Sequence, residues 1–502
     1  MLKLSHVTIR DLQDRCIVND LSFTIHAYDK VAVIGEEGNG KSTLLKAMLS
    51  DDSIASYASI SGKIEMDFKK CGYLPQQMDT KWYSYTCMEY LMEEDVAAYE
   101  IKIACKKLNI SWEMLDSCQR IQTLSGGEKV KIQLLKLYLQ QCEILFLDEP
   151  TNDLDIHAIE WLEQFLDSLE IPVVFVTHDE SLLSNCANRI LHLEQRNKKM
   201  KSVVNDFYGT YEEYLHTRQT ARNKEVKTAK KEKQEFLKKQ KKLNDIRNAV
   251  HHAQNKVSRQ APHTAKMLKR KMHAVKAMEQ RLEQVSLTKV DQVEEAIDLR
   301  FELVYGIHKK VVLEHEFSIS VGSRVLLKPQ MLSIHARDKI AITGKNGCGK
   351  SMLMKEIYAY LKDRSDLRIG YMPQNYGEQM DMDKNAISFL LDSKDKNDVS
   401  RSRELLGRIA FTRDEMEKPI HQLSEGSKAK LYLLKFIKQS AQVLLLDEPT
   451  RNLSPLSAAV IRTILASYDG CIIAVSHDRM FLCETVNEVW VMENQRLVTT
   501  DK

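Results

Sequence analysis

The sequence predicts an α/β fold in which two parallel-sheet domains are joined by a long α-helical hairpin. One observation is a set of motifs that occurs twice, in the same order, along the 502 residues. The other is a basic segment without glycine, residues 211–287, that separates the two copies. A chain of this length is also too long for one hydrophobic core. We expect domains at residues 1–200 and 299–502, with the linker at 201–298.

The repeat begins with a glycine-rich loop. It reads GEEGNGKST at residues 35–43 and GKNGCGKSM at residues 344–352, an offset of 309 residues. An aliphatic run precedes each loop, and a stretch with high helix propensity follows it. Strand, loop and helix in this order form the context that a phosphate-binding loop requires.

Three further motifs follow in the same order in both halves. In each half the signature serine precedes the Asp of the LDEP run by 23 residues, and that Asp precedes a histidine by 30. Matched spacings of this kind predict two copies of one fold whose apolar runs form buried parallel strands. The pairs are LSGGE (124–128) with LSEGS (423–427), LFLDEPT (145–151) with LLLDEPT (444–450), and VTHD (176–179) with VSHD (475–478).

The residue types in the glycine loops predict binding of a polyphosphate. Backbone N–H groups surround the phosphates, and the following helix N-terminus adds partial positive charge. Lys41 and Lys350 would neutralise the β- and γ-phosphates. A simple turn is the alternative for a single loop, but two complete copies exclude it. The predicted nucleotide-binding residues are Gly35, Gly38, Asn39, Gly40, Lys41, Ser42 and Thr43, and Gly344, Asn346, Gly347, Gly349, Lys350, Ser351 and Met352.

Two adjacent acids end an aliphatic run in each half. Asp148 and Asp447 come first, where a carboxylate at the C-terminal edge of a parallel strand can hold Mg²⁺. Glu149 and Glu448 come one residue later, so strand alternation and the following proline aim them elsewhere, toward a water that faces the γ-phosphate. We therefore predict both glutamates as catalytic bases.

A histidine follows the next aliphatic run in each half. His178 and His477 fall at the edge of the predicted sheets, where a side chain can contact a γ-phosphate. We predict both as catalytic residues. A structural histidine is the alternative for each of them.

Together these motifs resemble the ATP-binding-cassette (ABC) family, whose signature reads LSGGE and LSEGS in this chain. The resemblance implies ATP and Mg²⁺ as ligands and two P-loop nucleotide-binding domains that pair head to tail. Each ATP then lies between one domain's glycine loop and the other domain's signature. The implied signature residues are Ser125, Gly126, Gly127, Ser424, Glu425 and Gly426. The implied metal site includes the Q-loop glutamines and consists of Ser42, Gln76, Asp148, Ser351, Gln374 and Asp447.

The chain departs from the family pattern at several positions. Glu425 replaces the first signature glycine, and Ser454 stands where the first half has Asp155. A carboxylate at position 425 should repel nucleotide unless it points outward, so we hypothesise asymmetric hydrolysis. Leu12 and Val321 stand where an aromatic residue usually stacks on adenine, which leaves ATP and GTP both open.

The segment between the copies is strongly basic. Residues 218–285 contain 20 Lys and Arg against six Asp and Glu, whereas the whole chain has a net charge of +3. The high helix propensity of residues 211–287 and the single Pro262 predict two helices. The first would be roughly 70 Å long at 1.5 Å per residue, so we expect a projecting arm with its tip near 246–265. A solvated helix face or a self-pairing coiled coil is the alternative.

An excess of one sign of charge predicts a polyanionic partner, and an RNA backbone suits a long basic helix better than a flat membrane does. Tandem cassettes with such a linker resemble the F subfamily of ABC proteins, which acts on ribosomes. The resemblance implies a linker that enters the E-site and approaches the peptidyl-transferase centre, 23S rRNA and P-site tRNA. The predicted linker contacts to RNA are Lys256, Arg259, Lys266, Lys269, Arg270 and Lys271.

Two roles stay open within the F subfamily, namely a housekeeping translation factor and a protein that protects ribosomes from antibiotics. The first domain has 49 residues from Gln76 to Ser125 and the second has 50 from Gln374 to Ser424. The extra arm of some housekeeping members is therefore absent, which favours protection.

Two alternatives come from other classes of protein: the ATPase subunit of a membrane drug exporter, and a scaffold that uses nucleotide only as a switch. No run approaches the 18 or so apolar residues that a membrane helix needs. We expect a cytoplasmic ATPase that has no membrane domain and acts as a monomer with intramolecular domain pairing.

Overall fold

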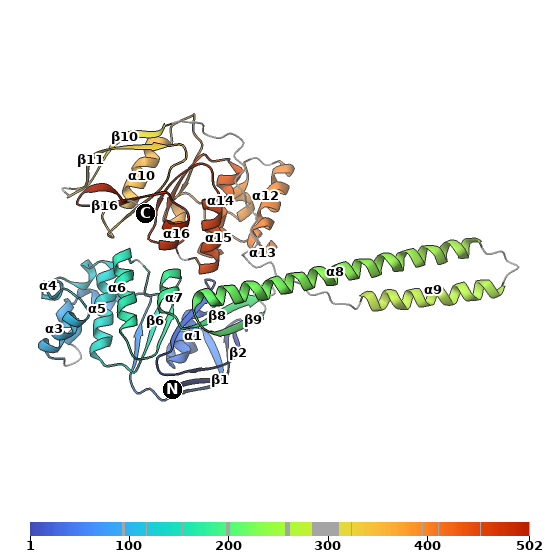
Figure 1. The fold of residues 1–502 in the computed structure, drawn as a ribbon, viewed down its shortest axis with the longest axis horizontal. Helices are drawn as coiled ribbons and strands as arrows, with labels where there is room; N and C mark the ends of the chain where they lie inside the picture. Colours follow the sequence, from blue (N-terminus) through green and yellow to red (C-terminus); the bar gives the residue numbers. More distant parts are fainter. Residues whose placement is uncertain are drawn as a thin grey trace. The chain divides into compact units, whose positions relative to one another are not determined.

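The computed structural model describes residues 1–92, 96–116, 118–152, 154–196, 201–256, 262–283, 311–322, 324–392, 395–409, 411–451 and 453–500 (Figure 1). The chain divides into two compact units. One consists of Met1–Tyr211 with Val293–Lys502, and the other is Glu212–Gln292. The first unit contains two α/β domains and the second contains the helical linker.

The first α/β domain is built on a six-stranded sheet with the order β5-β6-β7-β3-β8-β9. All neighbours are parallel except β9, which runs antiparallel to β8. Every residue of β6 and β7 is buried, as expected for strands covered on both faces. The strands are β3 (Lys30–Gly35), β5 (Cys71–Leu74), β6 (Ile144–Asp148), β7 (Val173–Val176), β8 (Arg189–Arg196) and β9 (Lys201–Tyr208).

The second α/β domain repeats this topology strand for strand, with the order β13-β14-β15-β12-β16-β17. Its one antiparallel pair is again at the edge, between β16 and β17. The predicted fold class, two copies of one α/β domain, is therefore confirmed. The strands are β12 (Lys339–Gly344), β13 (Ile369–Met372), β14 (Val443–Asp447), β15 (Cys471–Val475), β16 (Glu488–Glu493) and β17 (Arg496–Thr500).

A smaller antiparallel sheet accompanies each central sheet. It has the order β2-β1-β4 in the first domain and consists of the pair β10-β11 in the second, among the described residues. The strands are β1 (Leu2–Asp11), β2 (Cys16–Ile25), β4 (Ala58–Met66), β10 (Val311–Val321) and β11 (Arg324–His335).

The helices occur in matching order in the two domains. A helix follows each glycine loop (α1 and α10), each signature (α5 and α14), each LDEPT run (α6 and α15) and each histidine motif (α7 and α16). The first domain has α1 (Lys41–Met48), α2 (Cys87–Met92), α3 (Ala98–Lys107), α4 (Trp112–Asp116), α5 (Gly126–Leu139), α6 (Ile156–Asp167) and α7 (Glu180–Cys186). The second has α10 (Lys350–Leu361), α11 (Ala386–Leu390), α12 (Lys396–Arg408), α13 (Arg413–Glu417), α14 (Glu425–Lys438), α15 (Pro455–Ala466) and α16 (Arg479–Glu484).

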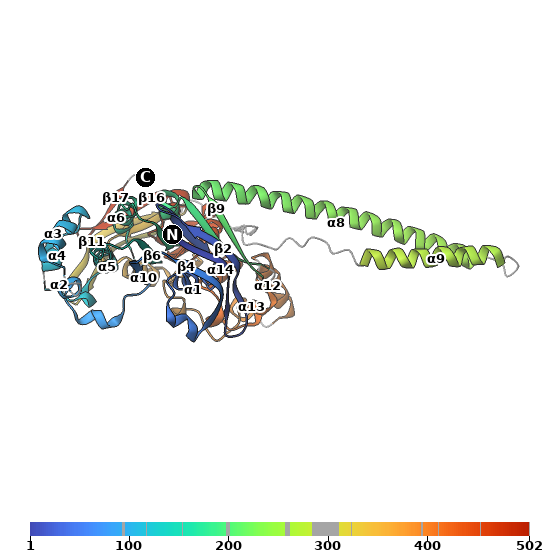
Figure 2. The same cartoon turned by 90° about the horizontal axis from the view of Figure 1, so that it is seen from below.

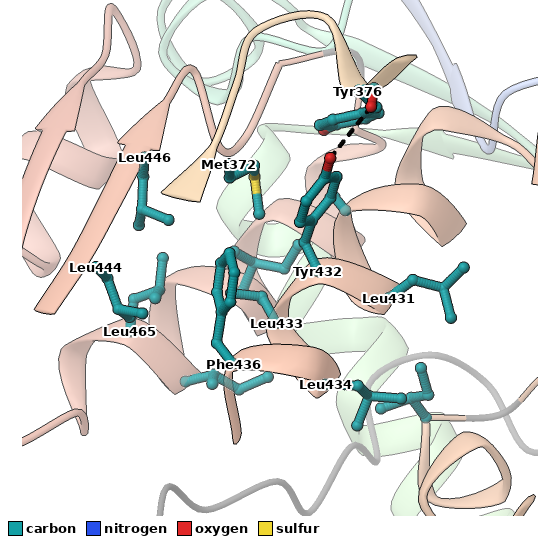
Figure 3. Close-up of a cluster of buried hydrophobic side chains, with 14 of the residues drawn as sticks. Met372, Tyr376, Leu431, Tyr432, Leu433, Leu434, Phe436, Leu444, Leu446 and Leu465 are labelled. Atoms are coloured by element: carbon teal, nitrogen blue, oxygen red, sulfur yellow. Dashed lines mark hydrogen bonds between the residues drawn. The ribbon is translucent and has the colours of Figure 1, made fainter. Parts of the chain in front are cut away.

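The signature helix of the second domain is fixed by a hydrophobic cluster (Figure 3). Tyr432 and Phe436 of α14 lie in this cluster together with Leu444 and Leu446 of β14. The buried Tyr432 hydroxyl donates a hydrogen bond to the Tyr376 carbonyl at 3.1 Å. Apolar burial of this kind holds the N-terminus of α14, and thus the signature, at a fixed position on the sheet.

The linker unit consists of the helices α8 (Tyr211–Lys256) and α9 (Pro262–Glu283). In both views they run antiparallel and side by side (Figures 1 and 2). Leu243 and Val250 of α8 and Val275 of α9 are buried, whereas most other described linker side chains are exposed. The predicted start at Tyr211 and the division into two helices agree with the structure.

The predicted end of the first domain differs in detail from the structure. The strand β9 pairs with β8, so the first sheet extends past the predicted boundary at residue 200. The predicted tip near 246–265 includes the last residue of α8, Lys256, and the first residue of α9, Pro262, a helix position that proline favours. The predicted boundary between residues 298 and 299 lies outside the described residues. No described helix is long and apolar enough to cross a membrane.

Candidate functional site

Each glycine loop joins a central strand to a helix, β3 to α1 and β12 to α10. Gly40 and Gly349 are the N-caps of these helices, with left-handed φ angles of 85° and 109°. A Cβ atom at Gly40 would lie 2.0 Å from Cγ2 of Ile17, and one at Gly349 would lie 3.1 Å from Cδ1 of Leu326. The loop conformation therefore requires glycine at both positions.

The loop lysines are buried and held by the loop backbone. The Lys41 ammonium donates to the carbonyls of Gly35 (2.9 Å) and Glu36 (3.1 Å). Lys350 donates in the same way to Gly344 (2.8 Å) and Lys345 (3.0 Å). Burial lowers the pKa of Lys41, although the carboxylates around it act in the opposite direction. Each ammonium group is thus fixed inside the curve of its loop.

A serine and an aspartate lie together at the end of each glycine loop. The Ser42 hydroxyl donates to Oδ1 of Asp148 at 2.9 Å. In the second domain both carboxylate oxygens of Asp447 are buried without a hydrogen-bond partner in the described part of the chain. Burial raises the pKa of both aspartates. A buried carboxylate next to a hydroxyl and a phosphate-binding loop is a set of oxygen ligands that fits Mg²⁺.

The glutamates after these aspartates have a strained backbone. Glu149 and Glu448 have φ angles of 51° and 54°, a region that residues other than glycine seldom occupy. Their N–H groups donate to the carbonyls of Val176 (3.0 Å) and Val475 (2.9 Å), which holds the turn. Strain of this kind persists where the surrounding structure enforces it, as at catalytic sites.

Glu149 is positioned by three side chains. Its Oε2 accepts hydrogen bonds from Gln76 (3.0 Å) and Asn152 (2.6 Å), and its Oε1 lies 3.4 Å from Nε2 of His178. Burial raises the pKa of Glu149, but His178, Asn152 and Lys41 together outweigh burial and lower it to about 2. The first domain therefore holds an ionised glutamate in one orientation. The Q-loop amide contacts this glutamate, whereas the sequence predicted Gln76 as a metal ligand.

Glu448 lies in a different environment. Its Oε1 is 3.8 Å from Nε2 of His477, and both ring nitrogens of His477 are buried without a hydrogen-bond partner among the described residues. Burial and the charge of Asp447 raise the pKa of Glu448 to about 8. Burial, together with the charge of Lys350, lowers the pKa of His477 to about 4. Both shifts favour the uncharged forms of Glu448 and His477, in contrast to the ionised Glu149 of the first domain.

One residue that the sequence analysis missed accounts for part of this difference. Asn152 follows the first LDEPT run and binds Glu149, and Arg451 takes the corresponding position in the second domain. Both residues keep the backbone contact, since each donates its N–H to the carbonyl of the glutamate three residues before it, and the charge of Arg451 acts against the rise in the pKa of Glu448. The signal was present in the aligned segments TND and TRN.

The signature serines begin the helices α5 and α14. Ser125 forms a capping box with Glu128, in which its Oγ accepts from the Glu128 N–H at 3.3 Å and its own N–H donates to the Glu128 carboxylate at 2.8 Å. Ser424 caps α14 by accepting from the Ser427 N–H at 3.2 Å. Ser427 has no carboxylate, so the second signature keeps half of the box. The N-terminus of each of these helices carries partial positive charge, which suits an anion.

Glu425 is compensated within its own helix. The Lys428 ammonium donates to Oε1 of Glu425 at 2.6 Å, so the repulsion expected from the sequence is reduced. The Glu425 N–H donates a hydrogen bond to Oε2 of Glu37, a carboxylate of the first glycine loop, at 2.9 Å. Asn346 takes the position of Glu37 in the second loop. The acidic excess at the first site therefore comes from Glu37 as much as from Glu425.

The residues Asp155 and Ser454, which also distinguish the two halves, have the same local role. Asp155 caps α6 by accepting from the Ala158 N–H at 2.9 Å, and Ser454 caps α15 by accepting from the Ser457 N–H at 3.3 Å. The charge of Asp155 acts on His477 against the lowering of its pKa. The exchange of Asp for Ser thus removes a charge without removing a helix cap.

A cleft of about 660 Å³ surrounds the second glycine loop and includes residues of both α/β domains. Val321 and Leu326 line it, and no Phe, Tyr or Trp of the described residues does. This agrees with the missing adenine-stacking aromatic. The predicted site residues among its lining are Gly126, His178, Asn346, Gly347, Gly349, Lys350, Ser351, Met352, Gln374, Asp447, Glu448 and His477.

The predicted RNA contacts belong to the two linker helices. Lys269, Arg270 and Lys271 are exposed on α9. Lys256 is the last residue of α8 and Lys266 lies in the first turns of α9. Arg259 lies outside the described residues.

Comparison with known proteins identifies relatives over almost the whole chain. ABC transporter F family member 5 of Arabidopsis thaliana is 27% identical over 531 residues, which cover 95% of this chain and 73% of that protein. Ribosome protection protein VmlR of Bacillus subtilis is 28% identical over 502 residues, which cover 96% of this chain and 85% of that protein. The chain therefore has homologues within the F family of ABC proteins.

The fold has counterparts among solved structures. An archaeal ribosome recycling factor, solved in complex with the ribosomal stalk protein, matches with a TM-score of 0.58 and 17% identity, over 98% of this chain and 89% of that chain. The sequence model of the ABC transporter family matches residues 18–152 and 327–451, more than half of the chain. The chain thus belongs to the ABC transporter family, and it is an ATPase with two ATP-binding domains in one polypeptide.

Proposed function

We propose that this ATPase acts on ribosomes through its basic linker and protects them from antibiotics. The observation that carries the proposal is the helical hairpin of α8 and α9, placed between two ATP-binding domains and rich in Lys and Arg. Residues 218–285 contain 20 basic and six acidic side chains, so pairing within the hairpin leaves most of the positive charge unbalanced. A polyanion is the natural partner of such a surface.

RNA suits this hairpin for two reasons. Each phosphate that a Lys or Arg neutralises releases a counterion, so a row of basic residues binds RNA strongly at low salt. Three consecutive residues of α9 are exposed and available for phosphate contacts, namely Lys269, Arg270 and Lys271. The proposal places 23S rRNA and P-site tRNA near the far end of the hairpin, as the resemblance to the F subfamily implies.

ATP binding and hydrolysis at the nucleotide sites would determine when the protein binds the ribosome and when it leaves. Lys41 and Lys350 would bind the β- and γ-phosphates, and the signature residues of the opposite domain would bind the same ATP. Ser42 with Asp148, and Ser351 with Asp447, would hold Mg²⁺, which neutralises phosphate charge. Of the Q-loop glutamines, Gln76 donates to Glu149, and Gln374 lines the cleft that also contains Ser351 and Asp447.

Glu149 is the proposed general base of the first site. Its ionised carboxylate accepts a proton from water as the water oxygen bonds to the γ-phosphorus and the bond to the leaving ADP oxygen breaks. Gln76, Asn152 and His178 hold the carboxylate in one orientation during this step. Hydrolysis then opens the paired domains and releases the ribosome.

Protection is favoured over a housekeeping role in translation by two observations. The relative from Bacillus subtilis is named a ribosome protection protein, and it matches over 96% of this chain. The segment between Q-loop and signature is equally short in both domains, 49 and 50 residues. The alternative of an exporter subunit does not explain why the hairpin is so basic.

The test is to trap the protein on ribosomes. The Glu149→Gln/Glu448→Gln variant should sediment with 70S ribosomes when ATP is present, because binding is kept and hydrolysis is slowed. The matched control adds Lys269→Gln, Arg270→Gln and Lys271→Gln, which should release the protein from the pellet without changing ATP binding. Membrane association in place of ribosome sedimentation would contradict the proposal.

Protection itself needs a second measurement. Wild-type protein should restore cell-free translation in the presence of a drug that binds near the peptidyl-transferase centre, and the charge-neutralised hairpin variant should not. If the protein stimulates drug-free translation equally, the housekeeping role is correct.

A further inference from the structure

Two ion pairs join the first α/β domain to the second. Arg462 of α15 binds Glu180 of α7 in a bidentate manner, with Nη1 to Oε1 at 2.8 Å and Nη2 to Oε2 at 2.9 Å. Arg479 of α16 binds Glu163 of α6 through both Nη atoms, with Nη1 to Oε2 at 3.2 Å. The four side chains are 2%, 9%, 24% and 14% exposed, in the order in which they are named here. The pair of Arg462 and Glu180 is therefore buried, and the pair of Arg479 and Glu163 is partly shielded from solvent.

The two ion pairs are the same contact, repeated by the internal symmetry of the chain. The histidine motifs of the two domains are 299 residues apart, and the same offset relates Glu163 to Arg462 and Glu180 to Arg479. Position 163 of one domain therefore meets position 180 of the other, twice. This is the rule of a two-fold interface, in which residue i contacts j and j contacts i. At both positions the first domain carries Glu and the second carries Arg.

We propose that these four side chains form a charge code that selects pairing of the first domain with the second. Pairing of two first domains from separate chains would bring Glu163 against Glu180. Pairing of two second domains would bring Arg462 against Arg479. Like charges that face each other across a buried contact oppose association strongly, and opposite charges fix the register. The code thus favours head-to-tail pairing between unlike domains over pairing between like ones.

The code lies directly beside the nucleotide sites. Glu180 and Arg479 each follow a predicted catalytic histidine by two residues, and Glu180 and Arg462 line the same cleft as Lys350. Correct pairing is also what brings Gly126 of the first domain to the second glycine loop. ATPase activity, measured without ribosomes, therefore shows whether opposite charges face each other at these two contacts. Failure of this inference is distinct from failure of the ribosomal proposal.

The two ion pairs differ in how many other contacts a substitution would disturb. Arg462 also binds Glu484 of its own domain at 2.8 Å and lies 3.7 Å from Asp478, so its removal takes a partner from three acids at once, of which Glu180 is the most buried. Arg479 is more exposed, and its partner Glu163 is otherwise bonded to the Asn185 amide at 3.1 Å. The pair of Glu163 and Arg479 is thus the one to reverse.

The first experiment reverses this pair in the full-length chain. Glu163→Arg and Arg479→Glu should each lower ATPase activity by about tenfold or more, because like charges then face each other at a buried contact. The double variant should return to within about threefold of wild type. The matched control is Glu404→Arg at an exposed position of α12, which places like charges in the pair with Arg408, outside the contact, and should leave ATPase activity unchanged.

The second experiment mixes the two single variants. A Glu163→Arg chain has Arg at both positions and an Arg479→Glu chain has Glu at both, so each domain of one chain matches a domain of the other. The mixture should recover ATPase activity, whereas neither variant alone should. The same rule predicts a like-domain dimer for each variant alone, because Glu163→Arg allows two first domains to pair and Arg479→Glu allows two second domains to pair, and light scattering should detect both dimers. A folded double variant without activity, or single variants with wild-type activity, would overturn the charge code.

Two milder substitutions test the proposal if a charge-reversed variant does not fold. Glu163→Gln and Arg479→Gln remove one charge each, and if the two residues act as one contact the double variant loses no more activity than the worse single variant. Losses that multiply in the double variant would show two independent effects and overturn the proposal.

Discussion

The surroundings of Glu149 and Glu448 differ although the two motifs that contain them are nearly identical. Glu149 accepts hydrogen bonds from Gln76 and Asn152 and lies beside His178, whereas Glu448 has Arg451 in place of the asparagine. The pKa of Glu149 is lowered to about 2 and that of Glu448 is raised to about 8. The comparison teaches that a catalytic motif supplies the residue types, while neighbouring positions decide the orientation and the charge of the carboxylate.

The largest expected effect is on the chemical step. Glu149→Gln should lower single-turnover ATP hydrolysis by about 100-fold or more, because it removes a positioned general base. Glu448→Gln should cost less than about tenfold, because the glutamate that it replaces has fewer contacts to hold it as a base. Rapid-quench measurement of phosphate release separates the two. Equal losses in both variants would remove the asymmetry.

A smaller effect should follow from exchange of the residues after the LDEPT runs. Arg451→Asn should increase single-turnover hydrolysis in a Glu149→Gln background by about three- to tenfold, since it restores an amide donor beside Glu448. The reciprocal Asn152→Arg should decrease hydrolysis in a Glu448→Gln background. Phosphate release under the same conditions checks both, and no change in either would mean that the neighbouring residue is irrelevant.

The acidic residue of the first glycine loop should affect binding more than chemistry. Glu37→Asn should tighten ATP binding at the first site by about three- to tenfold, because a carboxylate no longer lies at the N-terminus of α14. The matched control, Asn346→Glu, should weaken binding at the second site. Titration with a fluorescent ATP analogue measures both affinities, and weaker binding in Glu37→Asn would contradict the argument.

The smallest effect is expected at the altered signature. Glu425→Gly restores the usual glycine but should change ATPase activity by less than about threefold, because Lys428 already neutralises the carboxylate. Steady-state hydrolysis with and without about 0.5 M salt, roughly three times the physiological ionic strength, tests this. A large gain at low salt would show that Glu425 repels nucleotide after all.

The sequence by itself determined the repeat, the order of strands and helices around each motif, and the two linker helices. Glycine loops and buried aliphatic runs have strong local signals, because backbone conformation and strand burial leave few residue types open. The long helix that begins at Tyr211 could also be predicted from the sequence, since helix propensity acts within a few turns. The candidate site residues in both domains could therefore be assigned from their motifs.

Only the tertiary structure decided how those residues interact. The contact of Glu37 with the Glu425 N–H, and the pairs of Arg462 with Glu180 and Arg479 with Glu163, join residues that are hundreds of positions apart. The opposite pKa shifts of Glu149 and Glu448 likewise depend on burial and on neighbours outside the motif. Electrostatic energies depend on the distance between groups in space and on local burial. The spacing of residues along the chain determines neither quantity.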